Sequence, residues 1–563
     1  MVDSKRKKRL GDMLLEEHII TDEQIEEALL QKKDRKLGEV LVDLGYTNET
    51  EIAKALSRQL GLEIVSLNGI QIEDNVLKLV DASILRKHVM VPIGFSPNNL
   101  NEVRVAMSDP MDMRGIDDFS IVTSLQVSPV IATTHDIMLT LDRFYGNSEA
   151  MRVAQEFAQE RRLRESQQEI VEVDEDITNS PIVLLVKAMI EQAARQRASD
   201  VHIEAMESRV RVRYRIDGAL YEKGNYDIQM LPAIMARIKI VGGMDISEKR
   251  KPQDGRITMT VDRVEYDIRA SILPTVYGEK CVLRLAQKKA LTRDKKELGF
   301  DDKELTVFDK MLSHPNGILL VTGPTGSGKS TTLYTALSEI NKESVNIITV
   351  EDPVEANIDG VNQVQVNAKA DMTFASALRS ILRQDPDIIM IGEIRDEETA
   401  EIAVQASITG HLVVSTLHTN SAAGTITRMI NMGVEGYLLA DSMIGVIAQR
   451  LVRRLCPDCK QAKKPDELER RLLDLDELDT ATIFEPKGCP LCNNTGYRGR
   501  TGIYEMMEIT PEIKELIARQ STTEEIKSES IRHGMVTLAM GARQKVLEGI
   551  TSLSEMIGVS ADE

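Results

Sequence analysis

The chain has 563 residues, too many for one hydrophobic core, and this length suggests roughly three or four domains. Its formal net charge of -19 argues against a dedicated nucleic-acid binder, which would present a basic face, while a hydrophobic fraction of 42% allows each domain a core. The sequence has neither a membrane-spanning apolar run nor a signal-peptide core after the basic pentad of residues 5–9. We therefore expect a cytoplasmic protein that meets the membrane only through partners.

Residues 10–60 contain an internal repeat. Each copy has a helix-start signal, Thr21 with Gln24 in the first and Asn48 with Glu51 in the second. The repeat therefore predicts a duplicated helical unit. The positions that match at a constant offset are Leu10 and Leu37, Gly11 and Gly38, Leu14 and Leu41, Ile25 and Ile52, Ala28 and Ala55, and Leu29 and Leu56.

A set of motif residues runs through this repeat: Arg9, Leu10, Gly11, Leu14, Leu29, Gln31, Leu37, Gly38, Leu41, Leu56 and Gln59. The set resembles the MshEN domain, the cyclic-di-GMP-binding N-terminal module of some secretion and pilus ATPases. The resemblance implies that these residues hold the dinucleotide, with leucines packed on its bases and Arg9 as a guanidinium fork. Two features depart from the family: the joint from Gln31 to Lys36 is short, and Lys36 precedes the second Leu-Gly pair. A helical docking module without a ligand is the alternative.

The next segments carry no recognisable chemistry. Residues 61–145 predict a small mixed α/β unit, because 89–94 and 103–107 are strand-like and 138–145 is helix-like. We assign residues 1–145 to one N-terminal domain of the type II secretion ATPase kind, with 1–61 as the cyclic-di-GMP module. Residues 146–178 are rich in Glu, Gln, Arg and Asp and predict a linker.

A second domain is expected over residues 179–288, beginning with the helix-start pair Ser180-Pro181. The alternation from Val210 to Ile216 places three arginines on one strand face, where they would repel one another unless an anion meets them. We predict that three arginines of this domain act as sensors or fingers for a nucleotide phosphate, held on a neighbouring subunit. The alternative is a solvated face with scattered acidic partners. The three are Arg215, Arg269 and Arg284.

The last domain, 301–563, follows a linker at 289–300 and contains a phosphate-binding loop. The loop residues are Gly323, Pro324, Thr325, Gly326, Ser327, Gly328, Lys329, Ser330 and Thr331. An apolar run precedes it and a helical pattern follows, which is the strand-loop-helix context that such a loop needs. Its glycines let backbone N–H groups turn toward a polyphosphate, while Lys329 neutralises the phosphates of ATP and Ser330 binds Mg²⁺.

Carboxylates follow two later apolar strands. Ligands of open α/β sheets lie at the carboxyl ends of the strands, where these groups fall. We predict that Glu393 orients and polarises the attacking water and that Glu351 and Glu355 assist it. Gly392 stands where many phosphate-loop enzymes have a metal-binding Asp, so Mg²⁺ should rest on Ser330 and water.

Two histidines flank a third strand of this domain. His411 and His418 would each be structural residues if taken alone. Because they accompany the other motifs, we predict that both sense the γ-phosphate.

The phosphate loop, the acidic box at 351–355, the Gly392-Glu393 pair and the histidine box at 411–418 occur in this order. Together they resemble the secretion ATPase superfamily from about residue 180 to 563. The resemblance implies a multidomain α/β chain with a RecA-like P-loop ATPase core, a preceding PAS-like α+β domain and a helical or mixed N-terminal module. Within the superfamily, the chain is similar to the pilus assembly motors of the PilB family, with the GspE family of type II secretion motors as the alternative.

The resemblance also implies partners. It predicts a homo-hexamer that drives pilin polymerisation at the inner face of the cytoplasmic membrane. There it would act on an inner-membrane platform protein and on cytoplasmic-ring proteins.

Four of the five cysteines form two C-x₂-C pairs. They are Cys456, Cys459, Cys489 and Cys492, and in a cytosolic protein they predict a tetrahedral zinc site rather than disulfides. Four cysteines leave no open coordination position, so the zinc would pin the insertion 456–492 to the core. Pilus retraction motors of the superfamily lack this feature, which favours extension. The fifth cysteine, Cys281, lies in an apolar strand and is predicted to be a core residue.

Two other classes of function stay open. A nucleic-acid translocase would share the phosphate loop, but 3% aromatic residues and no Trp leave few platforms for base stacking. A scaffold gated by a cyclic dinucleotide, without hydrolysis, is the second.

Overall fold

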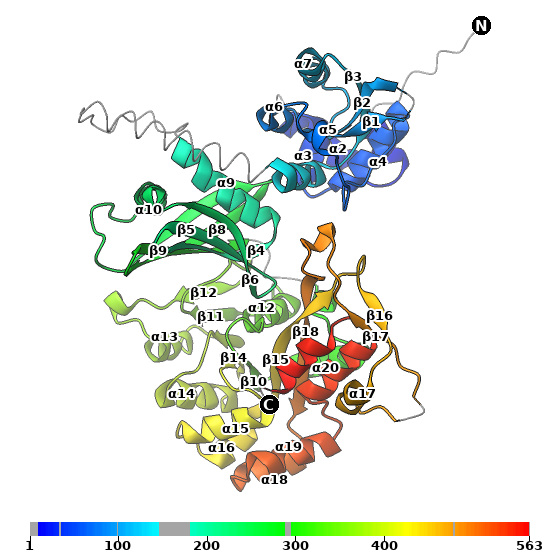
Figure 1. The fold of residues 1–563 in the computed structure, drawn as a ribbon. Helices are drawn as coiled ribbons and strands as arrows, with labels where there is room; N and C mark the ends of the chain where they lie inside the picture. The colour runs from blue at the N-terminus through cyan, green and yellow to red at the C-terminus, as the bar shows by residue number, and fades with distance from the viewer. Residues whose placement is uncertain are drawn as a thin grey trace. The chain divides into compact units, whose positions relative to one another are not determined.

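The computed structural model describes residues 10–32, 35–97, 99–145, 181–287, 294–476 and 479–561, and the linker predicted at 146–178 lies outside them. The chain divides into two compact units, Met1–Ala286 and Gln287–Glu563 (Figure 1). None of the described helices has the length and hydropathy that crossing a membrane requires.

The helical repeat forms four helices, α1 (Leu10–Glu16), α2 (Asp22–Gln31), α3 (Leu37–Asp43) and α4 (Glu49–Leu60). The side chains of Thr21 and Asn48 cap α2 and α4, as their sequence signals predict. A Cβ on Gly11 would lie 2.4 Å from Ile25 and 3.4 Å from Leu37, and one on Gly38 would lie 3.2 Å from Ile52 and 3.4 Å from Leu10. These reciprocal contacts show why both copies carry Leu-Gly: each glycine admits the leucine of the other copy.

A three-stranded sheet completes the N-terminal part of the first unit. Its elements are α5 (Asp74–Leu77), α6 (Ala82–Lys87), β1 (Met90–Ser96), β2 (Asn99–Met107), α7 (Met113–Thr123) and β3 (Gln126–Ile131), and residues 134–145 are helical. Strand β2 pairs with β1 antiparallel and with β3 parallel. The two ring nitrogens of His88 lie 2.8 Å from Asp112 and 2.9 Å from Asp118, which ties the end of α6 to α7.

The remainder of the first unit is a six-stranded sheet in the order β6-β5-β4-β9-β8-β7. Its elements are α9 (Pro181–Arg195), β4 (Ala198–Ala205), β5 (Arg209–Ile216), β6 (Ala219–Asp227), η2 (Ile228–Met230), α10 (Leu231–Val241), β7 (Gln253–Val261), β8 (Val264–Thr275) and β9 (Gly278–Gln287). Alternation along β5 buries Val210, Val212, Tyr214 and Ile216 in a core shared with α9 and α10. The arginines between them therefore occupy the opposite face of the sheet.

The second unit is built on a seven-stranded sheet in the order β12-β11-β13-β14-β10-β15-β18. The strands pair in parallel except for β15 with β18. Its first elements are η3 (Lys295–Leu298), α11 (Asp302–Leu312), β10 (Gly317–Thr322), α12 (Lys329–Ile340), β11 (Ile347–Glu351), β12 (Asn362–Gln365), η4 (Ala368–Ala370), α13 (Phe374–Ile381), β13 (Ile388–Ile391), α14 (Glu397–Ile408) and β14 (Leu412–Leu417). Strands β10, β11, β13 and β14 are buried throughout, as expected for a parallel sheet covered on both faces.

The rest of the second unit adds an insertion and a group of C-terminal helices. The elements are α15 (Ala422–Asn431), α16 (Gly436–Ser442), β15 (Met443–Leu455), β16 (Gln461–Lys463), α17 (Glu467–Leu472), β17 (Ile483–Glu485), η5 (Pro490–Cys492), β18 (Tyr497–Glu508), α18 (Pro511–Ala518), α19 (Thr523–Arg532), α20 (Leu538–Leu547) and α21 (Leu553–Ser560). The insertion lies between the paired strands β15 and β18, with β16 and β17 forming a small sheet of their own.

Candidate functional site

The phosphate loop runs from the end of β10 to the start of α12. Gly323 and Gly328 both have positive φ, +146° and +90°. A Cβ on Gly323 would lie 2.4 Å from the carbonyl oxygen of Gln449 and 2.6 Å from Ser327 Oγ, so no other residue fits there. Ser327 Oγ is buried and has no hydrogen-bond partner among the described residues, which leaves a hydroxyl inside the loop for a phosphate oxygen.

The loop holds its own lysine in place. Lys329 Nζ donates hydrogen bonds to the carbonyl oxygens of Gly323 (2.7 Å) and Pro324 (3.0 Å). Burial lowers the pKa of Lys329 to about 8, a shift that Glu393 opposes and Arg450 reinforces. The ammonium is therefore an under-solvated cation, and an incoming polyphosphate would both pair with it and raise its pKa again.

The register of the sheet brings the predicted water-orienting carboxylate to the loop. Thr322 pairs with Leu417, and Ile391 pairs with Ser415, so the carboxyl ends of β10, β13 and β14 lie at one edge. Glu393 Oε2 lies 3.4 Å from His418 Nε2, and Glu393 Oε1 lies 2.5 Å from Arg395 Nη2. Lys329 follows β10, Glu393 follows β13 and His418 follows β14, so all three lie at this edge, where the charge of Glu393 opposes the lowered pKa of Lys329.

The two glutamates of the acidic box differ in burial. Glu351 is 3% exposed and accepts hydrogen bonds from Thr349 (2.6 Å), Gln363 (3.0 Å) and Tyr334. The Tyr334 hydroxyl in turn accepts the backbone N–H of Glu355 at 3.2 Å. Glu351 thus positions the loop behind the site, while the Glu355 side chain is exposed.

The structure does not bring His411 to the phosphate loop of its own chain. His411 precedes β14, whose first residue, Leu412, pairs with Gly317 at the start of β10. It therefore lies at the amino end of the strand, whereas His418 follows the carboxyl end, six strand residues and about 20 Å further on. Its Nδ1 lies 2.8 Å from the Ala406 carbonyl oxygen, a contact that closes the turn after α14.

The arginine face of the six-stranded sheet carries its own anions, as in the alternative of a solvated face with scattered acidic partners. Glu204 on β4 pairs with Arg211 (3.1 Å) and Arg213 (2.8 Å). Asp200 on the same strand, 5% exposed, pairs with Arg284 (3.1 Å) and Arg215 (3.7 Å).

The three arginines predicted to reach a phosphate remain open to solvent. The side chains of Arg215, Arg269 and Arg284 are 36%, 33% and 66% exposed. Arg269 Nε lies 3.9 Å from Asp267. Sequence analysis did not identify Asp200 and Glu204 as the anchors of this face, although their alternation along β4 was the signal that could have shown it.

The four cysteine sulphurs converge. The Sγ–Sγ distances are 3.8 Å between Cys456 and Cys489, 3.9 Å between Cys459 and Cys492, and 3.7 Å between Cys489 and Cys492. A tetrahedron of sulphurs about 2.3 Å from a zinc ion has edges of about 3.8 Å, so the donor set and its spacing fit zinc.

Backbone N–H groups favour the thiolate at one of the four cysteines, Cys492, whereas burial raises the pKa values of Cys456 and Cys459. Burial raises the pKa of Cys492, but the N–H groups of Cys489 (3.2 Å) and Gly496 (3.1 Å) outweigh it and lower the pKa to about 7. Lys460 Nζ donates to the Gly549 carbonyl oxygen at 2.8 Å, which attaches the insertion to the segment before α21. Cys281, on β9, is fully buried in the core of the six-stranded sheet, and burial raises its pKa to about 12.

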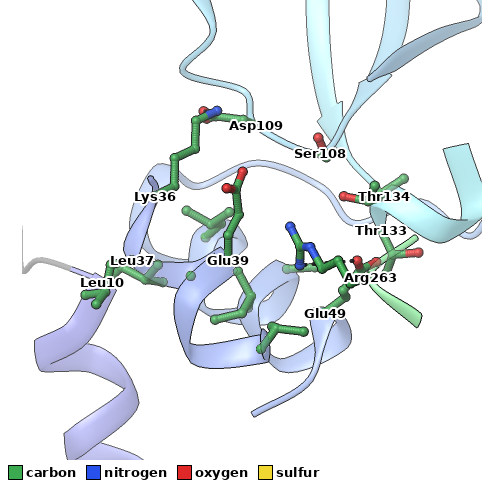
Figure 2. A pocket seen from close by; sticks show the side chains of 16 residues that line it. Leu10, Lys36, Leu37, Glu39, Glu49, Ser108, Asp109, Thr133, Thr134 and Arg263 are labelled. Carbon is green, nitrogen blue, oxygen red and sulfur yellow. Dashed lines mark hydrogen bonds and ion pairs between the residues drawn. The ribbon is translucent and has the colours of Figure 1, made fainter. Parts of the chain in front are cut away.

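A pocket of about 170 Å³ opens in the N-terminal part of the first unit. Four residues of the predicted dinucleotide motif line it: Leu10, Leu37, Gly38 and Leu56. Figure 2 shows Leu10 and Leu37 at one end of this pocket.

The other motif residues lie elsewhere. Leu14 and Leu41 are fully buried in the helical core and do not line the pocket, so their contact with a ligand stays a prediction. Gly11 is buried below Ile25, Leu29 is 52% exposed, Gln31 donates to Glu27 at 3.2 Å and Gln59 is half-buried. Arg9 lies outside the described residues.

Comparisons with known proteins agree with this architecture. The family model for "Type II/IV secretion system protein" matches residues 175–558, and that for the MshEN domain matches residues 60–151, which begins where the helical repeat ends. The chain is 43% identical over 566 residues to the type IV pilus assembly ATPase PilB of Myxococcus xanthus, covering 99% of each.

Two further proteins are similar to a smaller share of the chain. The chain is 48% identical over 396 residues to the type II secretion system protein E of Pseudomonas aeruginosa, covering 70% of this chain and 78% of that protein. The solved structure of the ATPase DotB of Legionella pneumophila is similar at 21% identity with a TM-score of 0.51, covering 68% of this chain and 96% of that chain. The DotB likeness shows the fold.

Proposed function

Because the chain belongs to the type II/IV secretion system protein family, we propose that it is an ATPase whose turnover drives the assembly of a type IV pilus. The observation that supports hydrolysis most strongly is the grouping of Lys329, Glu393 and His418 at one sheet edge. The match to a pilus assembly ATPase over the whole chain favours the pilus, whereas the match to a type II secretion protein covers a smaller share.

The residues have the following proposed roles. Backbone N–H groups of the loop 323–331 and the Lys329 ammonium bind the β- and γ-phosphates of ATP, and Ser330 binds Mg²⁺. Glu393 orients the attacking water, with Glu355 as an assisting carboxylate. His418 would respond to loss of the γ-phosphate through Glu393, and its contact with Glu393 at 3.4 Å supports this role.

Subunit association would complete this site. We propose a homo-hexamer in which Arg215, Arg269 and Arg284 reach the nucleotide of a neighbouring subunit. Two observations support that role: the three side chains are exposed, and their carboxylate partners are shared or distant. Arg215 and Arg284 share Asp200, and Arg269 Nε lies 3.9 Å from Asp267, so a polyphosphate would be a better partner for them. The motor would act on an inner-membrane platform protein together with cytoplasmic-ring proteins.

Two other ligands belong to the proposal. Zinc, bound by the four cysteines 456, 459, 489 and 492, would fix the insertion between β15 and β18 to the core without taking part in hydrolysis. Cyclic-di-GMP would bind at the pocket lined by Leu10 and Leu37 and regulate the motor. The MshEN match and the paired Leu-Gly motifs support it.

Steady-state phosphate release tests the assignment. Lys329→Ala and Glu393→Ala should each lower ATP turnover by about 100-fold or more, and Glu393→Ala should still bind ATP because the loop is intact. Lys369→Ala and Glu401→Ala, which alter exposed side chains of the same unit, are the matched controls. Full activity in both test variants would refute the site, and DNA-stimulated turnover with a steep salt dependence would favour the translocase instead.

A further inference from the structure

The N-terminal pocket has a wall that comes from a distant part of the sequence. Besides the leucines of the repeat, it is lined by Arg263, from the turn between β7 and β8 of the six-stranded sheet. Figure 2 shows this side chain entering opposite Leu10 and Leu37. The second rim cation is Lys36, from the joint between the two helical copies.

A buried ion cluster fixes the turn that carries Arg263. Asp262 and Arg263 both have left-handed φ values, 46° and 70°. Arg195, whose side chain is 6% exposed, pairs with Asp262 (2.9 Å) and with Asp142 (2.9 Å), and Arg86 also pairs with Asp142 (2.8 Å). Since breaking a buried pair leaves an uncompensated charge, this cluster holds the turn against the pocket.

The contacts between Arg263 and its carboxylate partners are long. Its Nε lies 3.3 Å from Asp43, and its Nη1 lies 3.8 Å from Glu49. Both distances exceed the roughly 2.7 to 2.9 Å of a charge-assisted hydrogen bond. Asp43 is further shared with Arg35. The Arg263 side chain is 34% exposed, so an anion could reach it from solvent and offer the bidentate geometry that these carboxylates do not.

The pocket suits one part of a nucleotide. Its volume of about 170 Å³ is below the roughly 300 Å³ at which sites for whole small ligands begin. The apolar floor of Leu10, Leu37, Ile52 and Leu56 matches the face of one purine base. The phosphates of such a ligand would then lie at the rim beside Arg263, whereas the Lys36 ammonium is paired with Asp109 at 2.5 Å.

We propose that Arg263 is a ligand-binding residue that the six-stranded sheet contributes to the dinucleotide site, where it binds a phosphate. This inference rests on the proposed regulation by cyclic-di-GMP. The ligand would contact both the helical repeat and the sheet that carries Arg215 and Arg284. If Arg263 changes position when the ligand binds, ligand affinity depends on the conformation of the sheet. By linkage, ligand binding then also shifts the conformation of the sheet.

Isothermal titration of the full chain with cyclic-di-GMP tests the inference. Arg263→Ala should bind about tenfold more weakly or worse, and Arg263→Lys should retain part of the affinity. Asp43→Asn should bind more tightly than the parent, because it removes the competing carboxylate. This carboxylate ends α3, where it opposes the helix dipole, so its loss should not destabilise the helix. Arg250→Ala, an 89% exposed arginine of the same sheet domain, is the control for net charge.

The outcomes separate this inference from the function it rests on. If the parent binds and Arg263→Ala binds within about twofold of it, the inference is overturned while the dinucleotide site stands. If Asp43→Asn weakens binding as Arg263→Ala does, the turn has only a structural role and the inference is again overturned. If the parent binds no cyclic-di-GMP, the proposed regulation fails and the inference with it.

Discussion

Glu204 anchors the arginine face of the six-stranded sheet, and replacing it by Gln should destabilise that sheet in a pH-dependent way. The residue is 5% exposed. Burial alone would raise the pKa of Glu204, but Arg213 and Lys280 outweigh burial and lower it from 4.5 to about 2. The difference corresponds to about 3 kcal/mol at pH 7, a large share of a typical domain stability of about 5 to 15 kcal/mol.

The direction of the pH effect follows from the lowered pKa. A carboxyl whose pKa is lower in the folded state contributes its full stabilisation above about pH 4.5 and loses it as the pH falls toward 2. Glu204→Gln should therefore cost about 3 kcal/mol at pH 7 and much less near pH 3.

Hydrogen exchange resolved by mass spectrometry is the suitable assay, because it reports the opening free energy of β4 and β5 separately from the other domains. Glu207→Gln, an exposed change in the same hairpin, is the control. Equal protection of Glu204→Gln and the parent at pH 7, or a loss that is the same at pH 7 and pH 3, would refute the reasoning.

Two further predictions concern the second unit. His418→Ala should lower ATP turnover by about tenfold or more, because His418 contacts Glu393. His411→Ala should leave the turnover of the isolated protein nearly unchanged, because His411 lies at the other end of β14. Equal losses in the two variants would contradict this difference in position. Cys456→Ser, or removal of metal by a chelator, should loosen the insertion and lower the melting temperature of the second unit before nucleotide binding is affected. If zinc is measured in the protein and its melting temperature does not change after the metal is shown to be lost, a structural role for zinc is contradicted.

The motifs that could be predicted from sequence are those whose partners are close in the chain or whose chemistry is unambiguous. The phosphate loop is contiguous, so Gly323 and Lys329 were identifiable without knowing the sheet order. The cysteine pairs are separate in sequence, but two C-x₂-C pairs in one chain have the spacing of a four-thiolate zinc site. The helical repeat was visible because Gly11 and Gly38 make equivalent contacts and so recur at a fixed offset.

The features that sequence reasoning missed depend on strand pairing. Asp200 and Glu204 neutralise arginines of β5 and β9, and only the register of β4 between these strands reveals it. Arg263 is more than 200 residues from Leu37 in the chain, yet both line one pocket. No local pattern reports such a contact.

His411 shows how a correct motif can still mislead. In a parallel sheet every strand has the same direction, so residues that precede a strand gather at one edge and residues that follow it gather at the other. A histidine box that spans β14 therefore places one histidine at each edge, although both histidines belong to one sequence motif. For His411 to influence hydrolysis, it would have to act through the packing of α14 and β14 or on a neighbouring subunit, and not on the phosphate that its own chain binds.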